Sequence, residues 1–169
     1  MQKSNVCRNR IFRKNTEILR VLEIRENKVL VIDCAKSRLP WWISLLDLKD
    51  AVEITEEDLL EEMGVCLSEN IPGVASKVMH ERFHMIAGIL PFVGEKKKRS
   101  YLIEETAIRY EVSVNTMKNY LISYLVYQNI TILAPKERKV EKELTQDEKN
   151  MRWALNERAN PPAMLGRIV

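Results

Sequence analysis

The sequence predicts an α+β protein in which a small β-rich lobe, hairpin or barrel-like in character, precedes a helical domain with a helix-turn-helix. β-branched and aliphatic residues dominate residues 16–43, whereas apolar residues recur at helical spacing over residues 76–128. The chain of 169 residues has the apolar and charged content of ordinary folded domains. We expect four segments, namely a basic arm at 1–15, the β-rich lobe with a short acidic helix at 16–70, the helical domain at 73–133, and a charged linker, short helix and atypical tail at 134–169.

Two strands are expected in the β-rich lobe, at ILRVLEI and KVLVIDC, with Glu26 and Asn27 as the turn of a hairpin. A third short strand covers Pro40 to Ile43, because proline suits the first position of a strand. Trp41 and Trp42 then face opposite sides of the sheet, since side chains alternate along a strand. We expect one of the two in the core.

The acidic helix of this lobe has a clear start signal. Thr55 and Asp58 form a capping box, in which each side chain can accept a hydrogen bond from the backbone of the other residue. The helix should run to Met63. The break at residues 70–73, which contains proline and glycine, then predicts a linker between the two lobes.

Beyond the linker, residues 76–90 carry an apolar stripe at helical spacing, which is typical of a core helix. Pro91 should end this helix, because proline cannot continue the hydrogen-bond pattern. Residues 94–99 are then expected to form a basic loop. Near the end of the chain, residues 145–148 predict the start of a final short helix that runs toward Trp153.

Residues 102–128 predict the helix-turn-helix. Ile103 and Ala107 share one face of the first helix, and the small Ala107 allows the second helix to approach closely. The joint runs from Glu111 to Ser113, and Ser113 is a good N-cap for a helix that starts directly after it. Glu111 stands where such joints usually have glycine, so a left-handed backbone there would cost about 1 kcal/mol or more.

The second helix of the motif turns its apolar residues inward and leaves polar side chains exposed near its start. In a helix-turn-helix, the first turns of this helix contact base edges in the DNA major groove. Asparagine pairs bidentately with adenine, threonine contacts a thymine methyl group or a phosphate, and lysine binds phosphate. We therefore expect double-stranded DNA as the partner, with contacts from Asn115, Thr116, Lys118 and Asn119 on a helix that Ser113 orients. A plain helical hairpin is the alternative.

Positive charge is clustered although the net charge is only +3. One cluster lies in the amino-terminal arm, and acidic residues are concentrated at residues 47–62, so the basic segments are locally stronger than the net charge suggests. A basic run can neutralise phosphates and release counterions. A solvated loop is the alternative for any single run. The second cluster directly precedes the motif and supplies candidate phosphate anchors at Lys96, Lys97, Lys98 and Arg99.

Several other classes of protein are disfavoured. No apolar run is long enough to cross a bilayer, and residues 1–10 lack the apolar stretch of a secretory signal. Cys7, Cys34 and Cys66 are odd in number and widely spaced, which indicates reduced thiols. There is no glycine-rich phosphate loop and no Ser/His/Asp constellation. We expect a cytoplasmic protein with no catalytic residues, no metal, no cofactor and no membrane partner.

One enzyme motif competes with this interpretation. Residues 80–84 read HERFH, which matches the HExxH pattern of zinc hydrolases. On a helix, His80 and His84 would share a face and could bind zinc, while Glu81 could activate a zinc-bound water. Glu104 is the candidate third ligand, but it is expected on the outer face of its helix beside the cationic KKKR segment. A short pattern of this kind also arises by chance in helices, so we favour two partly exposed histidines.

The sequence resembles the N-terminal part of bacterial Mu-like transposon integrases, which are DDE transposases. The resemblance lies in RVLEIRENKVLVIDCAKSRLPWWI, VMHERFHMIAGILPF, IEETAIRYEVSVNTMKNYLISYLVYQNITILAPK and LTQDEKNMRWALN, and it extends from about Ile18 to Asn156. It implies a DNA-recognition region that precedes an RNase H-like core, whose carboxylates bind magnesium and drive strand transfer. The residues after Asn156 look unlike the family's continuation, so we expect a chain truncated before that core and catalytically silent.

The resemblance implies that the chain binds transposon-end DNA, and other transposase subunits are further candidate partners. The β-rich lobe is then either another DNA-binding module or a protein-contact module. A stand-alone helix-turn-helix transcription regulator is the main competing hypothesis, and it would favour a dimer on a palindromic operator. Two further hypotheses are the zinc hydrolase and a fragment that only binds partner proteins.

Overall fold

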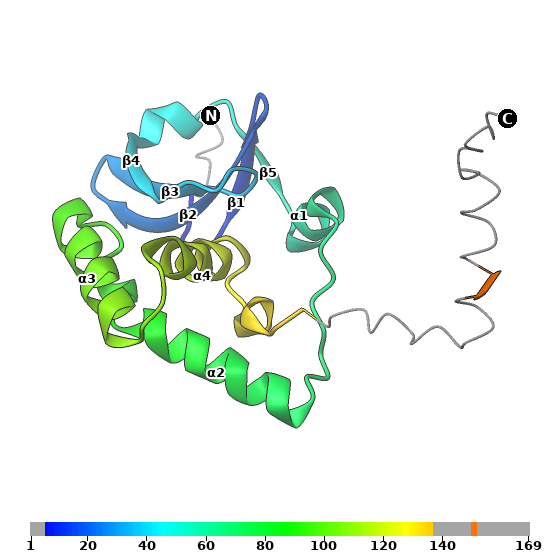
Figure 1. Cartoon of the computed structure of the whole chain (residues 1–169). Helices are drawn as coiled ribbons and strands as arrows, with labels where there is room; N and C mark the ends of the chain where they lie inside the picture. Colours follow the sequence, from blue (N-terminus) through cyan, green and yellow to red (C-terminus); the bar gives the residue numbers. More distant parts are fainter. Residues whose placement is uncertain (1–5, 137–149, 152–169) are drawn as a thin grey trace, which may run out of the picture. The chain divides into compact units, whose positions relative to one another are not determined.

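The fold is described from a computed structural model that defines residues 6–136 and 150–151. The expected α+β class is confirmed, because an antiparallel sheet near the amino terminus is followed by α-helices (Figure 1). Met1–Pro135 form one compact unit and Lys136–Val169 form a second. In the second unit Asn150 and Met151 are helical, and the rest of the predicted final helix lies outside the described residues.

Five antiparallel strands form the sheet in the order β4-β3-β2-β1-β5. The expected hairpin is present, since Arg25 pairs with Lys28 and Glu26 adopts a left-handed φ of 49° in the turn. Two strands were not predicted, and one of them occupies part of the segment expected to be a basic arm. The strands are β1 (Ile11–Lys14), β2 (Glu17–Arg25), β3 (Lys28–Asp33), β4 (Trp41–Ser44) and β5 (Val52–Ile54).

Both faces of the central strands β2 and β3 are buried. On one face, side chains such as Leu30 and Ile32 join the main core with the helices. On the other face, Val29 and Val31 pack with Leu48 from the short 3-10 helix η1 (Leu45–Leu48). Alternation along β4 therefore places Trp42 against the main core and Trp41 against the smaller cluster, and both are partly buried. The opposite orientation of the two tryptophans is confirmed.

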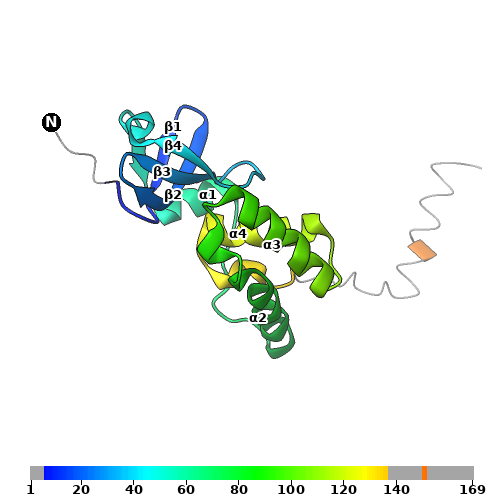
Figure 2. The same cartoon turned by 90° about the vertical axis from the view of Figure 1, so that its left-hand side faces the viewer.

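Four α-helices follow within residues 6–136, and Figure 2 shows three of them, α2, α3 and α4, packed together. The acidic helix begins and ends as predicted, with the Thr55–Asp58 capping box present. The predicted helix at 76–90 instead begins at Gly73 and ends at Ala87, and Pro91 lies in a following 3-10 turn. The helices are α1 (Glu56–Met63), α2 (Gly73–Ala87), α3 (Lys96–Arg109) and α4 (Val114–Tyr127), with 3-10 turns η2 (Leu90–Phe92) and η3 (Ile130–Leu133).

The sheet and the helices share one core. Leu30 and Ile32 from β3 belong to the same buried cluster as Ile86, Ile103 and other residues of α2, α3 and α4. Polar contacts also join the layers: the Trp42 indole donates a hydrogen bond to the Gly94 carbonyl (2.9 Å). The boundary that we placed at residues 70–73 therefore falls inside one compact unit. This packing fixes the edge of the sheet against the helix-turn-helix.

Candidate nucleic-acid interface

The joint between α3 and α4 has the geometry expected of a helix-turn-helix. Glu111 adopts a left-handed φ of 55°, although it carries a β-carbon. Val112 is partly buried and packs on the main core. Ser113 caps α4, because its hydroxyl accepts a hydrogen bond from the amide of Thr116 (3.1 Å). The local signals in the sequence were therefore sufficient to place this joint.

The apolar stripe of α4 is buried as expected. Met117 and Leu121 are fully buried in the main core. Asn115 and Asn119 are exposed, and Lys118 is half-buried. Thr116 differs from its expected role as a free contact, because its hydroxyl shares a hydrogen bond with the Ser113 hydroxyl (2.8 Å). Of the four α4 side chains predicted to contact DNA, the two asparagines and Lys118 therefore remain available to a ligand.

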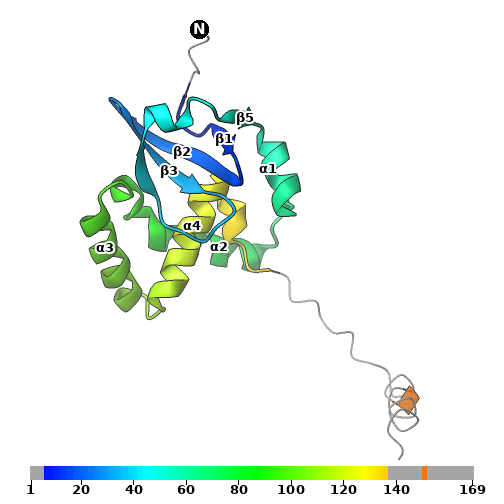
Figure 3. The same cartoon turned by 90° about the horizontal axis from the view of Figure 1, so that it is seen from above.

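These α4 side chains line a pocket of about 490 Å³ together with parts of the chain that are far away in the sequence. Its lining residues come from the start of α3, the amino-terminal half of α4, and the segment between β3 and β4 with the first residue of β4. The backbone of α3, α4 and the sheet can be followed in Figure 3. We call it the cationic pocket, because it is lined by four basic residues and no acidic one. The lining residues are Ser37, Arg38, Leu39, Pro40, Trp41, Lys96, Arg99, Asn115, Lys118, Asn119 and Ile122.

The KKKR segment differs from the expected loop, since it forms the first turn of α3. Successive residues of a helix point about 100° apart, so the four side chains cannot form one patch. Lys96 lines the cationic pocket. Lys98 instead lies over the ring of Phe92, with 3.6 Å from its Nζ to the ring centroid. Lys97 is exposed and does not line this pocket.

Arg99 was expected to be a free phosphate anchor, and the structure places it in the interior instead. Its side chain donates hydrogen bonds through Nη1 to the carbonyls of Pro40 (3.0 Å) and Val93 (2.7 Å). Nε is buried and has no hydrogen-bond partner within residues 6–136 and 150–151. Burial lowers the pKa of Arg99 below its ordinary value. Arg99 thus fastens the segment before β4 to the start of α3.

Sequence reasoning missed the contribution of the segment between β3 and β4. Arg38 lies in it, is exposed, and stacks over the ring of Trp41 at 4.1 Å from the centroid. A single arginine in a loop gives no signal of its own. The neighbouring tryptophans were the available hint, but pattern alone could not place them beside the start of α4.

The predicted arm is less available for a ligand than its charge suggests. Arg10 forms an ion pair with Glu53 (2.7 Å), and Arg13 forms one with Glu62. The acidic segment therefore lies against the arm and offsets its charge, which contradicts our interpretation that separation along the chain leaves the arm strongly basic. Lys3 lies outside the described residues.

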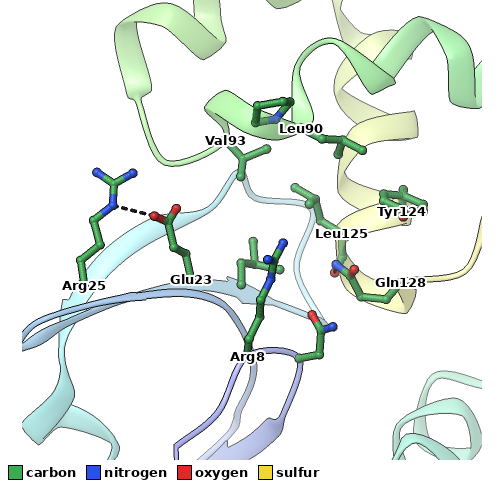
Figure 4. Close-up of a pocket in the computed structure, with 11 residues that line it drawn as sticks. Arg8, Glu23, Arg25, Leu90, Val93, Tyr124, Leu125 and Gln128 are labelled. Carbon is green, nitrogen blue, oxygen red and sulfur yellow. Dashed lines mark hydrogen bonds and ion pairs between the residues drawn. The ribbon is translucent and has the colours of Figure 1, made fainter.

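A second pocket, of about 390 Å³, lies at the other end of α4 (Figure 4). Tyr124, Leu125 and Gln128 form one side of it, and strand β2 forms another. This pocket is mixed in charge, because Glu23 lines it and accepts a hydrogen bond from Arg25 (2.6 Å). It is therefore less suited than the cationic pocket to a strongly anionic partner.

The HERFH motif lies on α2, where His80 and His84 are both exposed. Glu104 is exposed on α3. Within residues 6–136 and 150–151, no group of three or more His, Cys, Asp or Glu side chains is arranged to hold a metal ion. The three cysteines are free thiols, and burial raises the pKa of the Cys34 thiol to about 12.

Comparisons with known protein families and with curated protein sequences find no match to this chain. No helix in the described part of the chain is long and apolar enough to cross a membrane.

Proposed function

We propose that the chain binds double-stranded DNA in a sequence-specific manner, with the amino-terminal half of α4 in the major groove. The observation that carries this proposal is the cationic pocket, where Asn115, Lys118 and Asn119 lie beside Lys96 and Arg38. Base-reading and phosphate-binding side chains thus meet on one surface at the start of a helix. The second pocket also combines arginines with side-chain amides, but the carboxylate of Glu23 lines it as well.

The chemistry of these residues suits a duplex. An α-helix fits the major groove, and the exposed amides of Asn115 and Asn119, one helical turn apart, can each pair with the edge of an adenine. Lys118 and Lys96 carry charges for the flanking phosphates. Ser113 acts indirectly, since its cap fixes where the helix begins.

The DNA that we propose is the end of a transposon, and the residues are proposed to bind without performing a catalytic step. This rests on the resemblance to Mu-like transposon integrases, together with a fold in which a helix-turn-helix packs on a small sheet. In such a role other transposase subunits are proposed partners. DNA from the flanks of the gene that encodes the chain is therefore the first ligand to test.

Substitutions in α4 test the proposal with flanking duplexes and scrambled duplexes of equal length. Lys118→Ala should weaken binding to every duplex and reduce the slope of log affinity against log salt by about 1, because one phosphate contact is lost. Asn115→Ala should cost about 1–3 kcal/mol on the preferred duplex and much less on the scrambled one, because a base contact is lost. Fluorescence anisotropy across a salt series measures both effects.

Lys77→Ala is the matched control, since Lys77 is exposed on α2 and does not line the cationic pocket. Its affinity for each duplex should equal that of the wild type at every salt concentration. If Asn115→Ala and Lys118→Ala had equal effects on all duplexes, or behaved like Lys77→Ala, the assignment of base contacts to α4 would be wrong.

A further inference from the structure

The cationic pocket is unusual in this molecule because its charges are not compensated by carboxylates. Its basic residues are Arg38, Lys96, Arg99 and Lys118, and none of them belongs to an ion pair among the described residues. Elsewhere most arginines near the sheet are paired, as Arg10 is with Glu53. The positive charge at this pocket is therefore left for a ligand.

One of the four positive charges, that of Arg99, is held in place by the fold. Its side chain is 5 % exposed, and its hydrogen bonds reach only the neutral carbonyls of Pro40 and Val93. Nε has no acceptor among the residues that the structure describes. A buried guanidinium without a counter-charge is costly, because carbonyl dipoles replace only part of its hydration. An anion held in the pocket beside it would offset that cost.

Arg38 supplies a group that can contact such an anion directly. It is exposed, and its guanidinium is stacked on Trp41, which limits its freedom before a ligand arrives. The planar guanidinium matches two oxygens of a phosphate, and the ammonium of Lys118, which lines the same pocket, adds a point charge. The two groups come from the sheet edge and from α4.

We propose that the cationic pocket holds one backbone phosphate of the bound duplex, contacted by Arg38 from the β3–β4 segment and by Lys118 and Lys96 from the helices. This inference rests on the proposed DNA binding. Arg99 acts as a positioning residue, because its hydrogen bond to the Pro40 carbonyl connects the segment before β4 to the start of α3, and it adds positive charge at the pocket. The sheet is then a second DNA-contacting part of the molecule, which sets where α4 enters the groove.

The test combines Arg38→Ala with duplexes that carry a single uncharged methylphosphonate, scanned along both strands of the preferred site. One position should weaken wild-type binding by on the order of tenfold, because a charge-assisted contact is lost. The same position should have a clearly smaller effect on Arg38→Ala, since one of the three cationic partners of that phosphate is already absent. Thermal melting should show Arg38→Ala folded, because Arg38 is exposed.

Arg25→Ala is the matched control. Arg25 is also an exposed arginine near a tryptophan, at 5.1 Å from the Trp42 centroid, but it is paired with Glu23 at the mixed pocket. It should retain wild-type affinity and the full methylphosphonate effect. If Arg38→Ala behaves like Arg25→Ala, and no phosphate position is coupled to Arg38, the phosphate site is wrong while sequence-selective binding stands. Absence of any duplex binding by the wild type would instead refute the proposed function itself.

Free phosphate is distinguished in the same assay. Sodium phosphate and sodium chloride at equal ionic strength should compete equally with the duplex, because the site is completed by the rest of the DNA. Stronger competition by phosphate that requires Arg38, without coupling to any duplex position, would assign the pocket to a free anion and overturn the inference.

Discussion

At the scale of single residues, the partners of an arginine decide its role. Arg20 is fully buried, and donates to the carbonyls of Val126 (2.6 Å) and Asn9 (2.9 Å) and to both carboxylate oxygens of Glu56. Arg99 is buried against carbonyls alone, and Arg38 is exposed on a tryptophan. The amino-acid sequence alone does not distinguish these three arginines. Their burial depends on segments distant in the chain, so sequence reasoning assigned Arg99 to the surface wrongly and overlooked Arg38.

Replacing Arg20 tests its structural role. We expect Arg20→Met to lower the free energy of unfolding by about 2–3 kcal/mol, because the buried carbonyl of Val126 and the partly buried contact with the Asn9 carbonyl lose their donor while the side-chain volume is nearly kept. The half-exposed Glu56 contributes less, since water replaces part of its pairing. Urea unfolding at constant salt measures the change.

Arg10→Met is the comparison variant for this experiment. The Arg10–Glu53 pair is exposed on both sides, so its loss should cost less than about 1 kcal/mol. An Arg20→Met protein as stable as Arg10→Met would show that the buried hydrogen bonds add little to folding.

At the scale of elements, features that depend on neighbouring residues were predicted well, whereas features that depend on residues far apart in the chain were not. The Thr55 capping box and the Ser113 cap depend on residues three positions apart, so the sequence alone was sufficient to place the starts of α1 and α4. Strand β5 is three residues long and is held by pairing with β1, which no local pattern reveals. The start of α3 was missed because no capping residue marks it in the sequence. The residue before the helix is Glu95, which makes no side-chain cap hydrogen bond.

The turn between α3 and α4 offers a test at this scale. We expect Glu111→Gly to raise the free energy of unfolding by up to about 1 kcal/mol, because glycine removes the steric cost of a β-carbon at φ 55°. Part of the gain is offset by the greater freedom of glycine in the unfolded chain. The midpoint of chemical unfolding measures the change.

Glu111→Ala separates backbone strain from charge, because alanine keeps the β-carbon and removes the carboxylate. Its stability should stay close to that of the wild type. A glycine variant less stable than the alanine variant would mean that the turn is not strained by its side chain.

At the scale of the whole molecule, the candidate site is a product of packing between lobes that the sequence presents as separate. The α+β class and the helix-turn-helix could be predicted, because periodicity and caps report on each element alone. The cationic pocket could not, since Arg38, Lys96 and Lys118 meet only when the edge of the sheet docks on α3 and α4 through one core. The sheet is therefore part of the proposed DNA surface, although the sequence left its role open.

Selection of binding sites from a random pool of duplex DNA tests the central claim most directly, because it requires no prior choice of ligand. We expect the purified chain to enrich a short consensus that also occurs in the flanks of its gene, with its selectivity lost in Asn115→Ala and its affinity for all duplexes lowered in Lys118→Ala. Enrichment of no sequence, with binding that only follows ionic strength and is unchanged by both substitutions, would contradict the claim that α4 reads DNA.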